Sequence, residues 1–144
     1  MNNINNYINN LKLGIEKLNL LKIKKIEDII FKKIKENKKI FICGNGGSAS
    51  IANHFLCDFN KGIKISSKNK LKPKIVSLSN NIESILAIAN DISFKKIFSF
   101  QLDNYYTKGD IVILLSCSGS SPNILDVLKY CEKRKIFTIS LTGF

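Results

Sequence analysis

The segment KIFICGNGGS, residues 39–48, joins a short apolar run to a glycine-rich loop, and a helix-like stretch follows it from Ser48 to Asn60. A short apolar run that ends at glycines is typical of a buried strand. The segment therefore predicts a strand, a loop and a helix, in that order.

The same unit recurs along the chain. Apolar runs at residues 73–78 and 111–115 precede helix-like stretches that begin near Ile82 and cover residues 122–133, and a fourth run spans residues 136–141. Strands that are apolar throughout and alternate with helices are typical of a parallel sheet covered on both faces. The predicted fold class is therefore α/β, with a doubly wound parallel sheet.

The N-terminal part of the chain has a helical pattern. Residues 2–37 contain no proline, and their apolar residues recur at helical spacing. These are Ile4, Ile8, Leu11, Ile15, Leu18, Ile23, Ile26, Ile30 and Ile34. Two amphipathic helices fit, and their apolar stripes exceed what one face of a small sheet can cover. We expect residues 1–37 to form a helical, oligomerising region and residues 38–144 to form the α/β domain, with an exposed loop or frayed helix end at residues 61–72.

Charge does not identify a partner. The chain has 144 residues, which predicts one compact domain, and a formal net charge of +12. Such a charge raises nucleic acid as a partner, but only Arg134 is an arginine, and the lysines alternate with isoleucine and phenylalanine. Lysine, isoleucine and asparagine have A- and T-rich codons. Codon bias and solvated helix faces therefore explain the charge better than a nucleic-acid surface does.

Nothing in the sequence predicts export or membrane insertion. Cys43, Cys57, Cys117 and Cys131 form no CxxC pair, and the N-terminus lacks a basic start followed by a continuous apolar core. No apolar run reaches the length of a membrane span. We expect reduced thiols, no membrane partner and a cytoplasmic location.

Two loops at neighbouring strand ends are candidates for ligand binding, because ligands of open parallel sheets lie beyond the carboxyl ends of the strands. The first contains Asn45, Gly46, Gly47 and Ser48, and its glycines let the backbone amides of a helix start approach an anion. It is neither the dinucleotide-binding GxGxxG pattern nor a P-loop, which disfavours a nucleotide.

The second loop, SCSGSSPN at residues 116–123, places Ser116, Cys117, Ser118 and Ser121 before a helix. Hydroxyls and amide donors at a positive helix end suit a phosphate. The other interpretation is a serine-rich turn that only caps the helix, with Ser121 as the cap and Pro122 at the first helical position. The presence of two such loops favours a shared anionic ligand.

His54 is the single histidine, and Asp58 follows it by one helical turn, on the face that also carries Ser50. A solvated surface pair is one interpretation. Since the helix begins at the first loop, the pair could instead face a bound sugar, with Asp58 moving a proton and His54 polarising a hydroxyl or binding a metal.

Taken together, the motifs resemble one family. They are Gly44-Asn45-Gly46-Gly47-Ser48, Asn53-His54-Phe55, Ala87-Ile88-Ala89-Asn90-Asp91, Ser116 to Asn123, and Leu141-Thr142-Gly143. Their order and spacing over about residues 35–143 are similar to those of the phosphoheptose isomerases, members of the sugar isomerase (SIS) superfamily. The resemblance implies a flavodoxin-like, three-layer SIS fold, and the N-terminal helices are compatible with the helical start that such proteins use to assemble tetramers.

The resemblance also implies roles for individual residues. Ser116, Ser118 and Ser121 would hold the phosphate, with Cys117 where many relatives have threonine. Asn45 and Ser48 would contact the sugar, and Asp91 would line the pocket. His54 would be a metal-binding or acid/base histidine, and Asp58 stands where relatives carry a glutamate that acts as base and metal ligand. A divalent metal such as zinc is implied at this pair.

The implied reaction is ketose–aldose interconversion of sedoheptulose 7-phosphate and a heptose 7-phosphate for surface polysaccharide. Relatives continue into another strand and a final helix, which supply a glutamine and a second histidine to the active site. We expect the chain to be a piece of a longer protein or a naturally shortened form. The alternative function is a non-catalytic SIS module that binds a phosphosugar or a protein, and the two phosphate loops do not distinguish these functions.

Overall fold

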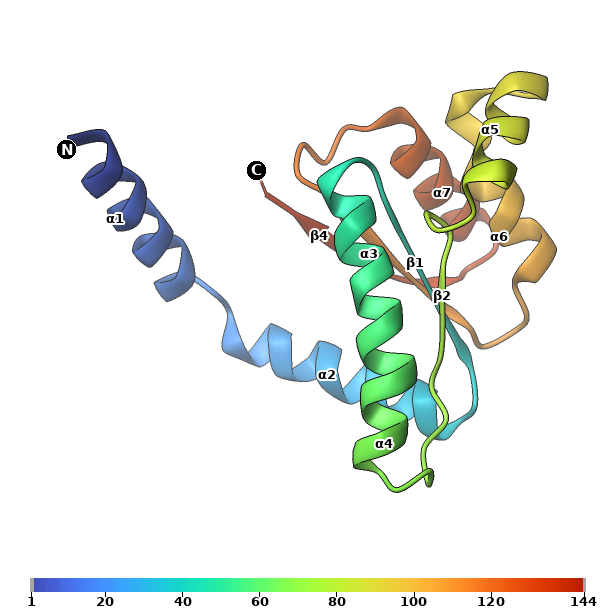
Figure 1. Cartoon of the computed structure of the whole chain (residues 1–144), viewed down its shortest axis with the longest axis horizontal. Helices are drawn as coiled ribbons and strands as arrows, with labels where there is room; N and C mark the ends of the chain where they lie inside the picture. Colours follow the sequence, from blue (N-terminus) through green and yellow to red (C-terminus); the bar gives the residue numbers. More distant parts are fainter. Residues whose placement is uncertain (1, 144) are drawn as a thin grey trace.

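The computed structural model describes residues 2–143 and contains helices on both sides of a single sheet (Figure 1). Its elements in chain order are α1 (Asn2–Glu16), α2 (Leu20–Lys35), β1 (Lys39–Gly44), α3 (Gly47–Cys57), the π-helix η1 (Asp58–Ile63), α4 (Lys64–Ser66), β2 (Lys74–Ser77), α5 (Ile82–Asp91), the 3₁₀-helix η2 (Phe94–Lys96), α6 (Ser99–Tyr105), β3 (Ile111–Ser116), α7 (Pro122–Lys133) and β4 (Phe137–Thr142). The four predicted strands are all present.

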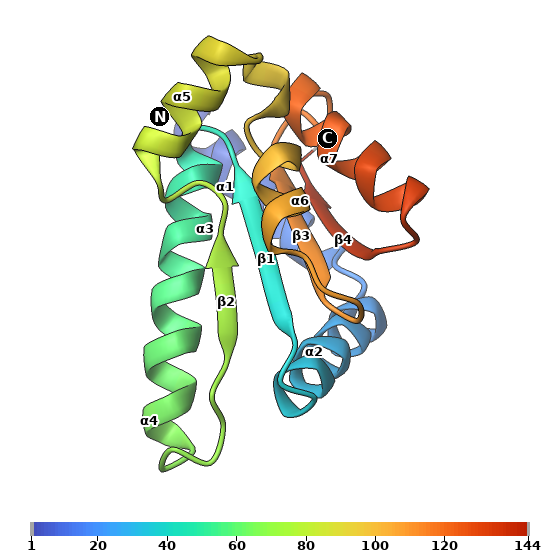
Figure 2. The same ribbon diagram turned by 90° about the vertical axis from the view of Figure 1, so that its right-hand side faces the viewer.

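The sheet has the strand order β2-β1-β3-β4, and every neighbouring pair is parallel. Helices α2 and α3 pack on one face, while α5, α6 and α7 pack on the other (Figure 2). Parallel strands need crossover connections, and these crossovers supply both helical layers. The prediction of a doubly wound, three-layer α/β fold is confirmed.

Alternation along β1 divides the hydrophobic core in two. Phe41 and Cys43 belong to the cluster beneath α5, α6 and α7, whereas Ile40 and Ile42 belong to the cluster beneath α2 and α3. All four side chains are at most 1% exposed. Because each face of the strand is covered, the sequence of β1 is apolar throughout instead of alternating.

The helix that starts at Gly47 extends further than the sequence pattern indicates. Of residues 61–72, expected as a loop or frayed helix end, residues 61–66 are helical in η1 and α4, and residues 67–72 form turns and a loop. Phe59 and Ile63 pack against the core beneath α2 and α3, which explains the extension. Asn60 of η1 donates from its Nδ2 to the Ile75 carbonyl and accepts from the Ile75 amide, both at 3.0 Å. Asn60 thereby satisfies an edge residue of β2 as a neighbouring strand would.

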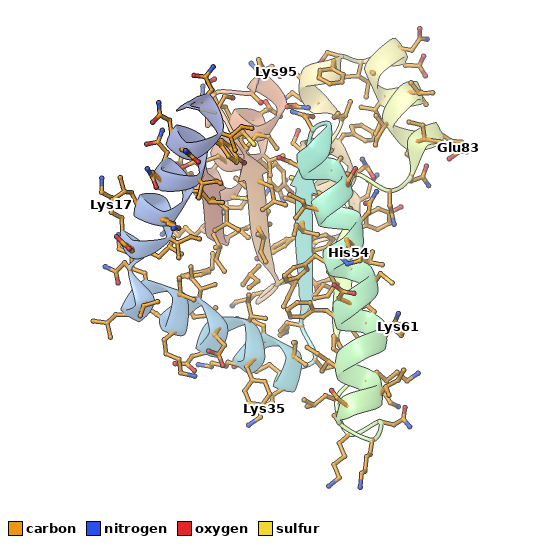
Figure 3. All side chains as sticks on the ribbon, turned by 60° about the vertical axis from the view of Figure 1, so that its left-hand side comes forward. Lys17, Lys35, His54, Lys61, Glu83 and Lys95 are labelled. Carbon is orange, nitrogen blue, oxygen red and sulfur yellow. The ribbon has the colours of Figure 1, made fainter. Side chains whose placement is uncertain are left out.

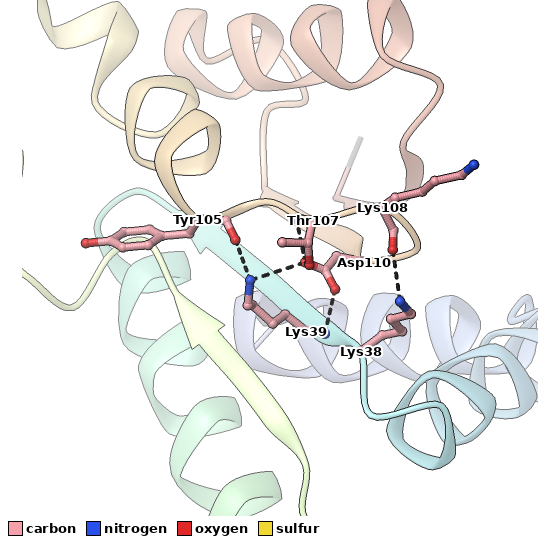
Figure 4. Close-up of polar contacts among 6 residues, drawn as sticks. All are labelled: Lys38, Lys39, Tyr105, Thr107, Lys108 and Asp110. Carbon is pink, nitrogen blue, oxygen red and sulfur yellow. Dashed lines mark hydrogen bonds and ion pairs between the residues drawn. The ribbon is translucent and has the colours of Figure 1, made fainter.

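At the opposite end of the strands, Asp110 joins the starts of β1 and β3 (Figure 4). Its side chain is 1% exposed and forms a 3.6 Å ion pair with the Lys39 ammonium. The Lys39 amide donates to Oδ1 at 2.9 Å, and the Thr107 amide and hydroxyl both donate to Oδ2 at 2.9 Å. A buried carboxylate is tolerated because these donors replace its water.

Helix α1 lies apart from the sheet (Figure 1). Residues 3–25 are all exposed, including the predicted stripe of Ile4, Ile8, Leu11 and Ile15, which are 41–65% exposed. Both predicted N-terminal helices are present, but only α2 contributes to the core, through Ile34 and its neighbours. None of the helices within residues 2–143 is sufficiently long and apolar to span a bilayer.

Candidate functional site

The two loops predicted to bind a ligand lie side by side. They follow β1 and β3, which are neighbours in the sheet, and Gly44 at the end of β1 pairs with Leu115 of β3. Helices α3 and α7 begin where these loops end. Two positive helix ends and their exposed amides therefore point toward the same edge of the sheet.

Glycine is required at two positions of the first loop. A Cβ atom on Gly44 would lie 2.6 Å from the Ser48 Cβ and 2.9 Å from the Ser48 carbonyl carbon, so any side chain would collide with the first turn of α3. Gly46 has φ of +51°, in the region that L-residues rarely adopt. These constraints hold the loop tightly against the helix start and leave its outer side open.

Ser79, just after β2, fixes the start of this loop from one side. The Ser79 hydroxyl donates to the Gly44 carbonyl at 2.9 Å and accepts from the Gly44 amide at 3.2 Å. Because Ser79 satisfies both backbone groups of Gly44, the loop has a defined origin before any ligand is present.

The second loop has hydroxyls available for a ligand. Within residues 2–143, the Ser116 Oγ is the buried side-chain oxygen or nitrogen without a hydrogen-bond partner, and its residue is 7% exposed. Ser121 is the N-cap residue of α7, with Pro122 after it as predicted, yet its side chain makes no capping hydrogen bond. Ser118 is exposed, and its Oγ accepts only a weak 3.3 Å bond from the Ser120 amide. The hydroxyls are therefore not used up by helix capping.

The loops contact each other directly. The Ser48 hydroxyl lies 3.9 Å from the Cys117 Sγ, and the side-chain amides of Asn45 and Asn123 exchange two hydrogen bonds, at 2.9 and 2.8 Å. Of the predicted phosphate and sugar contacts, Asn45, Gly46, Gly47, Ser48, Ser116, Cys117, Ser118 and Ser121 all lie on these two loops. Their assigned roles remain predictions.

His54 lies on an exposed side of the α3–η1 helix (Figure 3), and Asp58 follows one turn later on the same helix. Their Nε2 and Oδ2 atoms are 3.2 Å apart, and the side chains are 78% and 55% exposed. With Ser50, Ile51 and Phe55 they line an open hollow of about 480 Å³. In the isolated chain, His54 and Asp58 therefore form a solvated surface pair. The hollow beside them is open and has space for another molecule.

The pair supplies suitable donors for a metal but too few of them. Zinc in proteins is held by nitrogen, oxygen or sulfur ligands from three or four residues. Over residues 2–143, no three histidine, cysteine, aspartate or glutamate side chains gather closely enough to hold an ion. His54 and Asp58 could thus contribute two ligands, and a complete site would need others from outside the described chain.

Asp91 is not joined to the loops. It lies exposed at the end of α5, where its Oδ1 accepts a 2.8 Å hydrogen bond from Asn90. No hydrogen bond within the described residues connects it to either loop. Its predicted place in the pocket therefore stays a prediction.

Ser79 and Asn123 have structural roles at the site that were not predicted from the sequence. No sequence motif around Ser79 indicates the two hydrogen bonds that its hydroxyl makes with the Gly44 backbone. Asn123 does stand at the end of the SCSGSSPN segment, where an asparagine directly after Pro122 was the available signal. Its partner Asn45 is 78 residues distant in sequence, so the pairing became visible only in three dimensions.

The sequence is similar to those of known proteins. The sequence profile described as the SIS domain matches residues 5–143. The chain is 36% identical over 126 residues to a protein named probable phosphoheptose isomerase from Thermoplasma acidophilum, covering 88% of this chain and 68% of that relative. It is also 36% identical over 121 residues to the phosphoheptose isomerase of Helicobacter hepaticus, covering 84% of this chain and 60% of the relative.

A solved structure has a similar fold. The phosphoheptose isomerase of Neisseria gonorrhoeae superimposes with a TM-score of 0.79 at 30% identity, covering 91% of this chain and 66% of that one. The chain thus spans 60–68% of the length of these relatives.

Proposed function

The chain belongs to the SIS domain family, and from this membership we propose that it acts on a sugar phosphate as an isomerase that interconverts sedoheptulose 7-phosphate and a heptose 7-phosphate. Its relatives carry the name phosphoheptose isomerase in organisms as different as Thermoplasma acidophilum and Helicobacter hepaticus. The proposed product is an aldose phosphate for surface polysaccharide.

The observation that carries this proposal is the pair of joined loops at the ends of β1 and β3. They bring two helix N-termini together with hydroxyls that make no strong hydrogen bond of their own, above all the buried Ser116 Oγ. An orphaned buried hydroxyl is costly unless a ligand or water satisfies it. A phosphate supplies the acceptors that Ser116, Ser118 and Ser121 lack.

In the proposed chemistry, a base removes the proton from the carbon next to the ketose carbonyl, an enediol forms, and the proton returns to the former carbonyl carbon. Asp58 is the proposed base. His54, 3.2 Å from it, would shuttle the proton between the two enediol oxygens. The backbone amides of the first loop would stabilise the charge that develops on oxygen.

A divalent metal such as zinc would, when bound, polarise the substrate oxygens. His54 and Asp58 offer two ligands for it. Because the remaining ligands must come from elsewhere, the proton transfer above is assigned to protein groups alone.

We further propose a homo-oligomer, with a tetramer as the expected form and a cytoplasmic location. The exposed stripe on α1 supports this proposal, as does an apolar hollow of about 650 Å³ between α2 and η1. Surfaces of this kind are typical of protein contacts.

The experiment is to incubate the purified chain with sedoheptulose 7-phosphate, with and without zinc, and to measure both binding and aldose formation. Ser118→Ala/Ser121→Ala is the binding variant, and Ser66→Ala, a substitution of an exposed serine in α4, is the control. We expect wild type and control to bind and the double variant to lose binding with an unchanged melting temperature. Equal affinity in all three proteins would contradict the phosphate assignment.

The second candidate is a phosphosugar-binding module without catalysis. The exposure of His54 and Asp58, 78% and 55% within the described chain, favours it, because an open site does not exclude the water that weakens electrostatic interactions with a substrate. Binding without turnover, at any zinc concentration, would support this candidate over the isomerase.

A further inference from the structure

We infer that Asn123 is a positioning residue which, through its reciprocal amide pair with Asn45, sets the distance between the two loops of the ligand site. The inference rests on the proposed function, since it assigns the spacing a role in sugar-phosphate binding. It concerns a residue that makes no contact with solvent, being 0% exposed.

The hydrogen bonds determine the orientation of the Asn123 amide. Its Oδ1 accepts from the Asn45 Nδ2 at 2.9 Å and from the Ile124 amide at 3.0 Å, and its Nδ2 donates to the Asn45 Oδ1 at 2.8 Å. A flipped amide would place its NH₂ group against the Ile124 N–H, donor against donor. The Ile124 amide therefore fixes Asn123, and Asn123 in turn fixes Asn45.

The pair is placed where it can control the site. Asn45 follows the last residue of β1, and Asn123 lies in the first turn of α7, so the bonds connect the start of one loop to the end of the other. The second loop is also held at its start by β3, and the Gly143 amide donates to the Cys117 carbonyl at 3.1 Å. With its C-terminal end released, residues 118–121 would lose their fixed distance from the first loop.

A side-chain amide at both positions provides this reciprocal connection. Each side chain must donate one hydrogen bond and accept another. An ionised carboxylate can only accept, and alanine can do neither. Asn45 retains one N–H and one lone pair, so it can still contact a sugar as the family resemblance implies. The pair thus adds a positioning role to Asn45 without excluding contact with the ligand.

The test is a double-mutant cycle on the whole chain with Asn45→Ala, Asn123→Ala and the combined variant, measuring the Kd for sedoheptulose 7-phosphate by calorimetry. The control is Asn60→Ala, which also removes two hydrogen bonds of an asparagine but does so beside β2. Each single variant should weaken binding roughly tenfold and the combined variant should weaken it little further, because both changes break one connection. Asn60→Ala should lower the melting temperature while leaving the Kd unchanged.

Two outcomes would overturn the inference: an Asn123→Ala variant that binds as wild type does, or losses in the single variants that multiply in the combined one. If Asn123→Ala does not fold, Asn45→Ala and Asn45→Asp still test the pair from its less buried side. If the wild-type chain binds no sugar phosphate, the proposed function fails. The connection between the loops through Asn45 and Asn123 is then tested by amide hydrogen exchange. Exchange at residues 118–121 should then accelerate in Asn45→Ala and Asn123→Ala but not in Asn60→Ala, and unchanged exchange would refute the connection.

Discussion

At the scale of single residues, the cysteines separate by burial. Cys43 and Cys131 are buried, and Cys57 and Cys117 are exposed. Burial raises the pKa of the Cys43 thiol strongly and that of the Cys131 thiol to about 11, so both stay protonated and shielded at neutral pH.

We therefore expect iodoacetamide to modify Cys57 and Cys117 in the native protein and all four cysteines after unfolding, as measured by peptide mass spectrometry. Sedoheptulose 7-phosphate should protect Cys117, because this residue lies in the proposed phosphate loop. Cys57, at the end of α3, is the internal control. Protection of neither cysteine would argue against a ligand at the second loop.

Asp126 of α7 provides a pH-dependent contribution to stability. Burial raises its pKa, but hydrogen bonds from Lys96, at 2.7 Å, and from Ser99 outweigh this effect, so the pKa of Asp126 lies below the usual value of an aspartate. A carboxyl group whose folded pKa is lowered stabilises the fold above its unfolded pKa, and this stabilisation is lost as the pH falls through the folded value.

The free energy of unfolding should thus decrease when the pH is lowered from about 5 to below about 3. In Asp126→Asn this decrease should be smaller, as measured by urea titrations at several pH values. The variant should also be less stable than wild type at pH 7, where the Lys96 pair is intact. Identical pH slopes for the two proteins would show that Asp126 does not contribute.

At the scale of elements, sequence patterns predicted the helices and strands that have periodic or continuous apolar residues. They did not predict features that depend on contacts between residues far apart in the sequence. The strands and α7 were expected nearly at their observed limits, because apolar runs and the Ser121-Pro122 start are local signals. The short helices η2 and α6 were not expected, since no periodic stripe marks them. The loops of the site were predicted from their motifs, whereas the Asn45–Asn123 pair required the two loops to be seen together.

The connection between β1 and β3 at Asp110 yields a stability prediction. Asp110→Ala should lower the free energy of unfolding by about 3 kcal/mol, because it leaves the Lys39 amide and the Thr107 donors without an acceptor. The control is Asp103→Ala, which removes an exposed ion pair with Arg134 and an exposed hydrogen bond from the Tyr130 hydroxyl and should cost about 1 kcal/mol or less. Equal losses in urea titrations would contradict the importance of burial at Asp110.

At the scale of the whole molecule, α1 determines the expected assembly. Its stripe of Ile4, Ile8, Leu11 and Ile15 is exposed on a helix that stands apart from the core. The spacing of apolar residues predicted two amphipathic N-terminal helices. It could not predict that α1 lies apart from the sheet, because this spacing identifies an apolar face without identifying what covers it.

We predict that Leu11→Glu converts the oligomer to monomers in sedimentation experiments, because a charge on the stripe cannot be buried between subunits. Asn9→Glu, a change to glutamate on the opposite side of α1, should leave the sedimentation coefficient unchanged. A wild-type chain that sediments as a monomer at all concentrations would refute the proposed assembly.

The strand order also governs how the protein can be made. The central strand β1 pairs with β2 and β3, so Ile40 finds its partner Ile111 only after most of the chain has left the ribosome. Until then β1 has only β2 as a possible partner, and its other edge stays unpaired and can associate with other nascent chains. Helices α2 and α3, which directly precede and follow β1 in the sequence and cover one of its faces, are the first elements able to shield it during synthesis.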